Sequence, residues 1–181
     1  MKWSIEPLTA DLCNTLRIEA MMSMYGDQTC DIGNIHTSCF ASEACAYKFH
    51  PSELDILLHS SHAFVVTTEI HGRIAFCACV AADKCCHGIP EFSSVHANAT
   101  ALFVHTLCVD EKYRKHGIAS ALLAFLKRFG CDLYLTVATG EHTNHQNFFK
   151  ARSENLCKFY TKHDFTILCR NDRKLLLVYK V

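Results

Sequence analysis

The stretch from residue 107 to residue 123, LCVDEKYRKHGIASALL, carries the most information about the fold of this chain. It begins with apolar, strand-forming residues and passes through a short basic loop. From Gly117 it continues into small and apolar residues that are typical of an amphipathic helix. A helix N-terminus presents backbone N–H groups without intrahelical acceptors, and the helix dipole adds partial positive charge there. The pattern therefore predicts a strand, a turn and a helix whose start can hold a phosphate group.

The basic loop supplies the groups that a phosphate site needs. Gly117 lets the backbone approach an anion closely, and Ala119 leaves room beside it. Arg114 and Lys115 add positive side-chain charge. The stretch lacks the G-x-x-x-x-G-K-[ST] pattern of a Walker loop and the three glycines of a dinucleotide-binding fingerprint. A solvated turn with ordinary surface cations is the alternative interpretation at this point.

Strand and helix patterns alternate on both sides of this stretch. Hydrophobic periodicity predicts strands over residues 3–8, 63–70, 73–82, 100–109, 133–137, 165–169 and 174–180. It predicts helices over residues 10–25, 51–60, 118–129 and 153–162, and connections over 26–50 (with a short helix near 42–49), 83–98 and 138–150. The helix after Val109 makes a crossover, so the strands on either side of it should be parallel, whereas hairpins make their strands antiparallel. The sequence predicts an α/β (α+β) chain with a mixed sheet and helices on its faces.

Composition bounds the class of protein. The 181 residues are 50% hydrophobic and 20% charged, which suits a single globular domain over residues 1–181. The formal net charge is zero, so no overall positive field attracts nucleic acid or an anionic membrane. No apolar run reaches the length of about 18 residues that a membrane helix needs. We therefore expect neither a nucleic-acid partner nor a membrane partner.

Cysteine is unusually abundant, with 12 residues. The N-terminal residues lack the apolar core of a signal peptide, and several cysteines lie inside apolar runs such as residues 74–80. Free cysteine packs in such runs as a small hydrophobic residue. These features predict a cytoplasmic protein with reduced thiols.

A zinc site would give the cysteines and histidines another purpose. Candidate ligands occur in the predicted loops at Cys85, Cys86 and His87 and at His142 and His145. The four-ligand spacing of structural zinc sites is missing, so no metal is expected. The histidines of the 138–150 loop are expected to be solvated, in a segment that forms a wall or lid over a substrate.

Two motifs resemble those of the GNAT superfamily of acetyl-CoA-dependent N-acetyltransferases. Arg114-x-x-Gly117-x-Ala119 matches its R/Q-x-x-G-x-G/A signature, between a strand and a helix. Residues 155–165, NLCKFYTKHDF, resemble its N-x-x-x-x-Y-x-x-x-G-F segment, with Asp164 in place of the glycine. The resemblance covers most of the chain. It implies the GNAT fold, in which a mixed, mostly antiparallel central sheet has a fourth and a fifth strand that are parallel and splay apart, with helices on both faces.

The resemblance also implies roles for individual residues. The cosubstrate would be acetyl-CoA, used without a metal. The residues implied to bind it are Leu107, Cys108, Val109, Arg114, Lys115, His116, Gly117, Ile118, Ala119, Ser120 and Asn155. Tyr160 matches the general acid that protonates the leaving CoA thiolate, and packing on the sheet is its alternative role. Cys108 is expected to fill space in its strand, because direct transfer needs no cysteine nucleophile.

The segment 103–114, FVHTLCVDEKYR, resembles the histidine-bearing strand of the serotonin (arylalkylamine) N-acetyltransferases. That family carries two histidines two residues apart. His105 matches the second, and Phe103 stands in place of the first. An ammonium group must lose a proton before it can attack a thioester, and histidine suits this task near neutral pH. His105 is therefore the candidate base, directly or through water, with a packed strand histidine as the alternative.

The expected reaction is direct transfer of acetyl to the primary amine of a small molecule, of arylalkylamine or polyamine type, within a ternary complex. The long segments 26–50, 83–98 and 138–150 are predicted to close a pocket, which favours a small acceptor. A protein lysine or N-terminus is the alternative acceptor. A module that binds CoA without turnover is a further alternative, against which the presence of both His105 and Tyr160 argues. Folds of this type often form homodimers.

Overall fold

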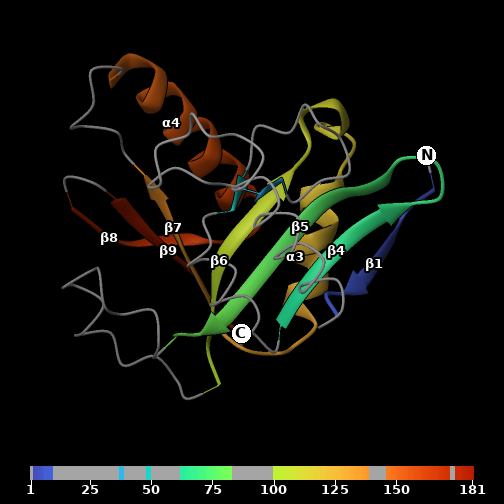
Figure 1. Cartoon of the computed structure of the whole chain (residues 1–181). Coiled ribbons are helices and arrows are strands. Elements are labelled where there is room, and N and C mark those ends of the chain that lie inside the picture. The colour runs from blue at the N-terminus through green and yellow to red at the C-terminus, as the bar shows by residue number, and fades with distance from the viewer. Residues whose placement is uncertain are drawn as a thin grey trace, which may run out of the picture. The chain divides into compact units, whose positions relative to one another are not determined.

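The computed structural model describes residues 2–9, 37–38, 48–49, 62–82, 100–138, 146–171 and 174–181 (Figure 1). Its main sheet has seven strands in the order β1-β4-β5-β6-β7-β9-β8. They are β1 Ser4–Pro7, β4 His62–Thr68, β5 Gly72–Ala81, β6 Leu102–Val109, β7 Leu133–Ala138, β8 Thr166–Arg170 and β9 Lys174–Tyr179. The helices are α3 Ile118–Lys127 and α4 Gln146–Lys162, with a 3-10 turn at Glu111–Tyr113. The strands β2 Thr37–Ser38 and β3 Lys48–Phe49 pair with each other.

The sheet is mixed, as the sequence predicts. The pairs β1/β4, β4/β5, β7/β9 and β8/β9 are antiparallel, whereas β6 and β7 are parallel and are joined through α3. The parallel register joins Leu102 to Leu133 and Phe103 to Tyr134, at the start of each strand. The predicted fold class is thus confirmed, and the expected parallel pair is β6 with β7.

The chain divides into two compact units. The first comprises residues 1–79 and 106–122. Its β5 is buried continuously from Ile74, and Val66 of β4 and Leu122 of α3 are fully buried too. A strand that is buried on both faces has an unbroken apolar sequence, which explains why the run over residues 74–80 shows no alternation of polar and apolar residues.

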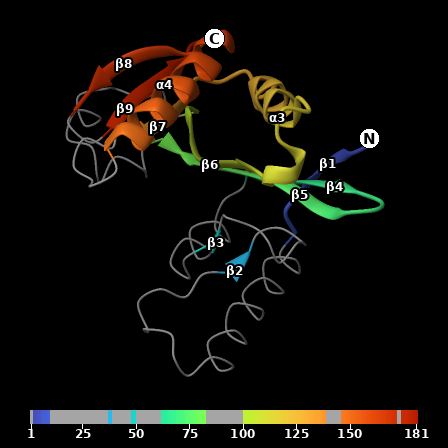
Figure 2. The ribbon, with the colours of Figure 1, turned by 90° about the horizontal axis from the view of Figure 1, so that it is seen from above.

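The second unit comprises residues 80–105 and 123–181. Its core gathers side chains from β6, β7 and β9 with the ends of β5: Val80, Ala82, Ala101, Phe103, Tyr134, Leu176 and Val178. Helix α4 lies against β7 in this unit (Figure 2). The edge strand β8 has a bulge between Ile167 and Cys169, and such bulges discourage edge-to-edge pairing with another chain.

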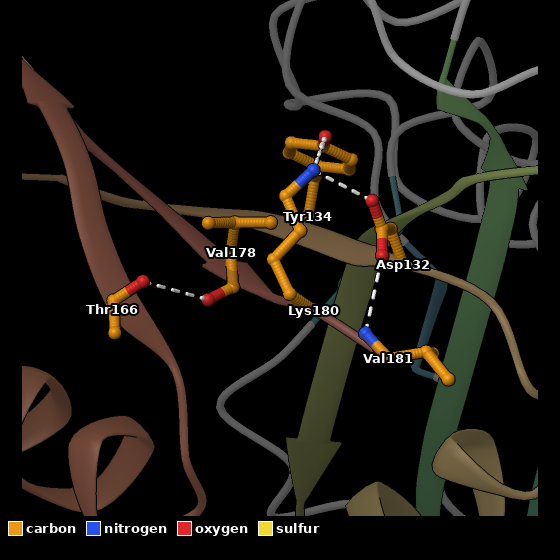
Figure 3. A network of polar contacts seen from close by, with 6 residues as sticks. All are labelled: Asp132, Tyr134, Thr166, Val178, Lys180 and Val181. Atoms are coloured by element: carbon orange, nitrogen blue, oxygen red, sulfur yellow. Dashed lines mark hydrogen bonds and ion pairs between the residues drawn. The ribbon is translucent and has the colours of Figure 1, made fainter.

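A polar network anchors the end of β9 in this second unit (Figure 3). Lys180 Nζ donates to Asp132 Oδ2 at 2.7 Å and to Tyr134 Oη at 3.2 Å. The Val181 amide donates to Asp132 Oδ1 at 3.3 Å. The buried Tyr134 hydroxyl thereby obtains a polar partner, as a buried hydroxyl requires.

Some predicted boundaries are wrong. Helix α4 begins at Gln146, so the end of the predicted 138–150 loop is helical, as are residues 151 and 152. That segment is polar overall, and the sequence prediction therefore made it a loop, although it contains good helix formers and two phenylalanines. Helix α3 ends at Lys127 because Gly130, with φ 64°, and bonds from residues 128–130 to the carbonyls three residues earlier close its last turn.

Other predicted elements fall on the segment before β4 and on the connection after β5. The short strands β2 and β3 lie inside the predicted 26–50 loop. The predicted helices at 10–25 and 51–60 and the predicted loop at 83–98 lie outside the described residues, as does the 42–47 part of the short helix predicted near 42–49. Residues 48 and 49 form strand β3, so the prediction of a helix is wrong there.

Candidate active site

The turn between β6 and α3 is organised by Asp110, which is buried. Its amide donates to Ile74 O at 2.9 Å, and its carbonyl accepts from the Tyr113 amide at 2.9 Å. Its carboxylate accepts from the Lys112 amide at 3.1 Å. A buried carboxylate that accepts backbone N–H groups fixes a short turn in one shape. No sequence pattern predicts this role, because a lone aspartate after a strand is not distinctive.

The middle of this turn adopts an uncommon backbone conformation. Lys115 has φ 66° and Gly117 has φ 79°. The left-handed conformation costs a residue with a Cβ about 1–2 kcal/mol, so the surrounding contacts must hold Lys115 there. A Cβ built on Gly117 would meet no atom within 4 Å. Gly117 is therefore required for its backbone angle, and the space above it is open to a ligand.

Helix α3 starts directly at this open space. Its first bond runs from the Ala121 amide to Gly117 O at 2.9 Å, so the Ile118 and Ala119 amides lie at its open end. Ile118 is buried and anchors the helix start. The first turn of α3 contains no acidic residue. These features fit a phosphate group, because the helix dipole and the backbone amides favour an anion there.

Three exposed cationic or titratable side chains flank this helix start: Arg114, Lys115 and His116. Arg114 Nε donates to Val109 O at 3.2 Å and so braces the turn against the end of β6. His116 Nδ1 lies 2.9 Å from Arg114 O. Because a carbonyl can only accept, this contact places the imidazole proton on Nδ1.

Two hydrogen bonds between the β5 and β6 segments indicate one extra residue between Ala101 and Asp110. The Asp110 amide bonds to Ile74 O at one end of the β5/β6 pair, and the Ala82 amide bonds to Ala101 O at the other. The stretch from Ala101 to Asp110 is one residue longer than the stretch from Ile74 to Ala82. An extra residue in β6 bends the strand and redirects its backbone groups. Leu107, Cys108 and Val109, all half-buried, lie in this strand.

Cys77, on β5, is a protonated thiol near neutral pH. The Cys77 thiol is buried and contacts the Cys79 thiol; this hydrogen bond and burial raise its pKa well above the ordinary value. A thiol with a raised pKa is a poor nucleophile near neutral pH.

Tyr160 lies in the last turn of α4, in the second unit. Its side chain is 9% exposed, and its ring packs edge-on against Phe159 and Phe165 at centroid distances of 5.2 and 5.7 Å. Its carbonyl accepts from the His163 amide at 2.8 Å and from the Phe165 amide at 3.2 Å. The backbone of the turn that ends α4 therefore closes on Tyr160 itself.

Asp164, which replaces the glycine of the family motif, has φ 63°. Aspartate tolerates this left-handed conformation better than most residues. Lys127 Nζ donates to Asp164 Oδ2 at 2.8 Å and to His163 O at 2.7 Å. The Lys127 ammonium lowers the pKa of the Asp164 carboxyl through this hydrogen bond and its charge. The departure from the motif was visible in the sequence, but its partner Lys127 was not.

The remaining predicted residues are placed as follows. His105 is half-buried on β6 and belongs to the second unit with Tyr160 and Asn155. Asn155 is exposed on α4. The predicted cosubstrate residues from Leu107 to Ser120 belong to the first unit. The predicted cosubstrate residues on β6 and α3 therefore lie in one unit, whereas Asn155 lies in the other.

Among the residues that the structure describes, no three His, Cys, Asp or Glu side chains are arranged to hold a metal ion. Cys85, Cys86, His87, His142 and His145 lie outside the described residues. Neither described α-helix has the length and hydrophobicity needed to cross a bilayer.

Comparison with known structures shows the same fold in acetyltransferases. The structure of Arabidopsis thaliana NAA60 in complex with acetyl-CoA is 15% identical, with a TM-score of 0.57 over 99% of this chain and 100% of that one. The NatC complex bound to Gag peptide and CoA is 14% identical, with a TM-score of 0.59 over 100% and 99%. Aminoglycoside 6'-N-acetyltransferase complexed with coenzyme A is 15% identical, with a TM-score of 0.51 over 99% and 96%. No curated protein sequence matches this chain.

The family model for the acetyltransferase (GNAT) domain matches residues 59–167. The matched region runs from the start of β4 to β8 and includes the β6–α3 turn and Tyr160. The chain is an acyltransferase whose cosubstrate is acetyl-CoA. On the family match and the shared fold together, the chain belongs to the GNAT family of acetyltransferases.

Proposed function

We propose that this enzyme acetylates the primary amine of a small molecule by direct transfer from acetyl-CoA, and that the β6–α3 turn binds the CoA pyrophosphate. The observation that carries the proposal is the turn around Gly117. It combines a left-handed glycine with open space above it, a helix start without acidic residues, and the exposed Arg114, Lys115 and His116. Backbone amides of Gly117 to Ser120 bind the phosphates, and the side chains add charge.

The pantetheine arm of CoA runs along the bulged strand. In this proposal the backbone groups of Leu107, Cys108 and Val109 pair with its amides, since a bulge redirects backbone groups away from the neighbouring strand. Asn155, exposed on α4, contacts the CoA chain. Cys108 contributes its backbone only.

The chemical step needs one proton acceptor and one proton donor. His105, directly or through water, takes the proton of the ammonium group, and the neutral amine attacks the thioester carbonyl. This attack forms the C–N bond and gives a tetrahedral intermediate, and the C–S bond breaks as the intermediate collapses. The nitrogen, which is positively charged after the attack, loses its surplus proton to water. The Tyr160 hydroxyl donates its proton to the departing thiolate. Tyr160 is suited to this role because α4 and the aromatic rings of Phe159 and Phe165 hold it in one place.

A second class of acceptor competes with the small amine that we propose. Acetylation of a protein N-terminus is the second candidate, favoured by the shared fold of NAA60 and of the NatC complex bound to Gag peptide. The shared fold of aminoglycoside 6'-N-acetyltransferase favours a small acceptor. An arylalkylamine or a polyamine is the small acceptor that we propose.

A panel of acceptors tests the proposal. The purified enzyme is incubated with acetyl-CoA and tryptamine, phenethylamine, spermidine, glucosamine phosphate or short peptides with a free N-terminus or lysine. Product is read by mass, because the 12 cysteines of the chain interfere with thiol-counting dyes. Acetylation of tryptamine, phenethylamine or spermidine supports the small-amine proposal. Acetylation of peptides alone contradicts it and identifies the second candidate as the function.

We also propose that the enzyme is cytoplasmic and acts as a single catalytic domain, in a homodimer. Among the described residues, the cysteines form no disulfide with one another: Cys77, Cys79, Cys108, Cys131, Cys157 and Cys169. Cysteines without a disulfide suit a reducing compartment. Light scattering on the purified protein measures its mass in solution, and a monomer at working concentrations would contradict the dimer.

A further inference from the structure

The turn after α4 is held by a side chain from another helix. Lys127, the last residue of α3, places its ammonium group against the turn that follows Tyr160. Nζ donates to His163 O at 2.7 Å and to Asp164 Oδ2 at 2.8 Å. It also lies 4.2 Å from the centroid of the Tyr179 ring on β9. One cation therefore ties α3, the turn after α4 and β9 together within the second unit.

This contact differs from an ordinary surface ion pair. The Lys127 side chain is 19% exposed, although that of Asp164 is 78% exposed. The ammonium accordingly makes two charge-assisted hydrogen bonds and a cation–π contact in a largely covered place. A covered cation with several directional partners restricts the position of each partner more than an exposed pair does.

The turn that Lys127 holds is the one that closes on Tyr160. The amides of His163 and Phe165 both donate to Tyr160 O, and the Phe165 ring packs on the Tyr160 ring. Asp164 stands between these two residues in the left-handed conformation, where aspartate is strained and glycine is not. Without the Lys127 ammonium, this turn loses two hydrogen bonds that stabilise the left-handed conformation of Asp164.

We infer that Lys127 is a positioning residue for acetyl transfer, which pins the turn at His163 and Asp164 and thereby holds Tyr160 in place to donate its proton. The inference rests on the proposed role of Tyr160 as the general acid. Lys127 itself touches neither substrate. Its effect on the reaction passes through the backbone that closes on Tyr160.

The chain offers a matched control for this contact. Lys180 Nζ also pairs with an aspartate, Asp132, at 2.7 Å and also lies over a tyrosine ring, Tyr134, at 5.6 Å (Figure 3). It belongs to the same unit, but its hydrogen bonds go to Asp132 and Tyr134 rather than to the turn after α4. Replacing either lysine by methionine removes one charge and keeps the apolar part of the side chain. Only Lys127→Met should affect Tyr160.

Hydrogen exchange measures the pinning directly and needs no acceptor. Mass spectrometry follows amide exchange in the peptide that contains residues 160–165. Lys127→Met should speed this exchange about tenfold, whereas Lys180→Met should leave it unchanged, because local opening governs the exchange of such a turn. Equal exchange in Lys127→Met and in the unchanged enzyme would overturn the inference.

A double-mutant cycle connects the pinning to the reaction. The assay uses whichever amine of the acceptor panel gives the most acetylated product. Lys127→Met should lower kcat about tenfold with less than a twofold change in KM for acetyl-CoA, since a displaced catalytic group costs rate rather than binding. In the Tyr160→Phe background the same change should alter kcat less than twofold. Lys127→Arg, which keeps the charge and the donors, should restore most of the rate.

The outcomes separate this inference from the proposed function. If Tyr160→Phe lowers kcat and Lys127→Met does not, the positioning role is wrong and the acid role stands. If Lys127→Met lowers kcat equally in both backgrounds, Lys127 acts independently of Tyr160 and the inference is overturned. If Tyr160→Phe leaves kcat unchanged, the acid role and this inference both fail. Asp164→Asn, which removes only the charge of the partner, replaces Lys127→Met in the cycle if the latter does not fold, and should lower kcat about threefold.

Discussion

The turn before α3 and the turn after α4 use the same backbone conformation in opposite ways. Each contains a residue with a side chain at positive φ, Lys115 at 66° and Asp164 at 63°. After α4, the chain supplies its own cation, Lys127, to the turn. Before α3, the space above Gly117 is open and the neighbouring cations are exposed. A turn filled by its own side chains holds a shape, whereas an open cationic turn is suited to an external anion.

The largest effect should come from filling the open turn. Gly117→Glu puts a carboxylate where the phosphates bind, and like charges in contact cost several kcal/mol. We expect acetyl-CoA affinity to fall about 100-fold or more, measured by isothermal titration calorimetry.

Gly130→Glu is the matched control for that change. Gly130 also has positive φ, 64°, and a Cβ there also meets no atom within 4 Å. The two variants therefore share the added charge and the backbone strain, and differ in which end of α3 they alter. Equal loss of affinity in both variants would remove the β6–α3 turn from the cosubstrate site.

A substitution at the turn after α4 should lower kcat and leave the affinity for acetyl-CoA unchanged. Tyr160→Phe removes the proton donor and keeps the packed ring, so kcat should fall about 100-fold while acetyl-CoA affinity stays the same. Tyr179→Phe, which also removes one tyrosine hydroxyl in the second unit, should retain kcat. A Tyr160→Phe enzyme with unchanged turnover would make Tyr160 a packing residue only.

A smaller effect is expected at His105, which neither turn contains. His105→Ala should lower kcat/KM about tenfold and shift the acidic limb of its pH profile, because another water can partly replace a relay histidine. The measurement is a pH–rate profile with the reactive amine at concentrations below its KM. An acidic limb that does not move would assign the ammonium proton to another acceptor and make His105 a packed strand histidine.

The two turns also show what a sequence can reveal. The fold class and the β6–α3 turn follow from local patterns, since a strand, a basic loop, a glycine and a helix are contiguous between Leu107 and Leu123. The motif around Tyr160 is equally local. The Lys127–Asp164 contact joins residues that are 37 positions apart, and a single lysine at a helix end has no distinctive pattern. Contacts of this kind depend on how helices and strands pack, which periodicity does not encode.

The predicted start of α4 is wrong for a different reason. The sequence prediction began this helix at Ser153, whereas it begins at Gln146. Polar and aromatic residues in the QNFFKAR segment gave no clear apolar stripe, although their helix propensities are adequate. Helix propensity, rather than an amphipathic pattern, therefore accounts for the start of α4 at Gln146.

The smallest expected effect concerns stability, and it arises in the filled turn. Burial, and then the charge of Lys127, lower the pKa of His163 below its ordinary value. The unfolded chain therefore binds a proton more readily than the folded protein does. The contribution of neutral His163 to the free energy of unfolding is fully present above about pH 6.5, the ordinary histidine pKa. It is lost as the pH falls through the lower pKa that His163 has in the folded protein. The melting temperature should accordingly fall between pH 7.5 and pH 5.5, with a contribution from His163 of about 2 °C at most, since the side chain is partly exposed.

Difference measurements isolate this contribution from that of the other histidines. His163→Gln removes the titrating group, so its melting temperature should fall less over the same pH range than that of the unchanged protein. Lys127→Met should also flatten the dependence, but by less, because burial is the larger cause of the lowered pKa. Scanning calorimetry at several pH values in one buffer system measures all three proteins. Identical slopes in the unchanged protein and in His163→Gln would mean that the filled turn exerts no electrostatic effect on His163.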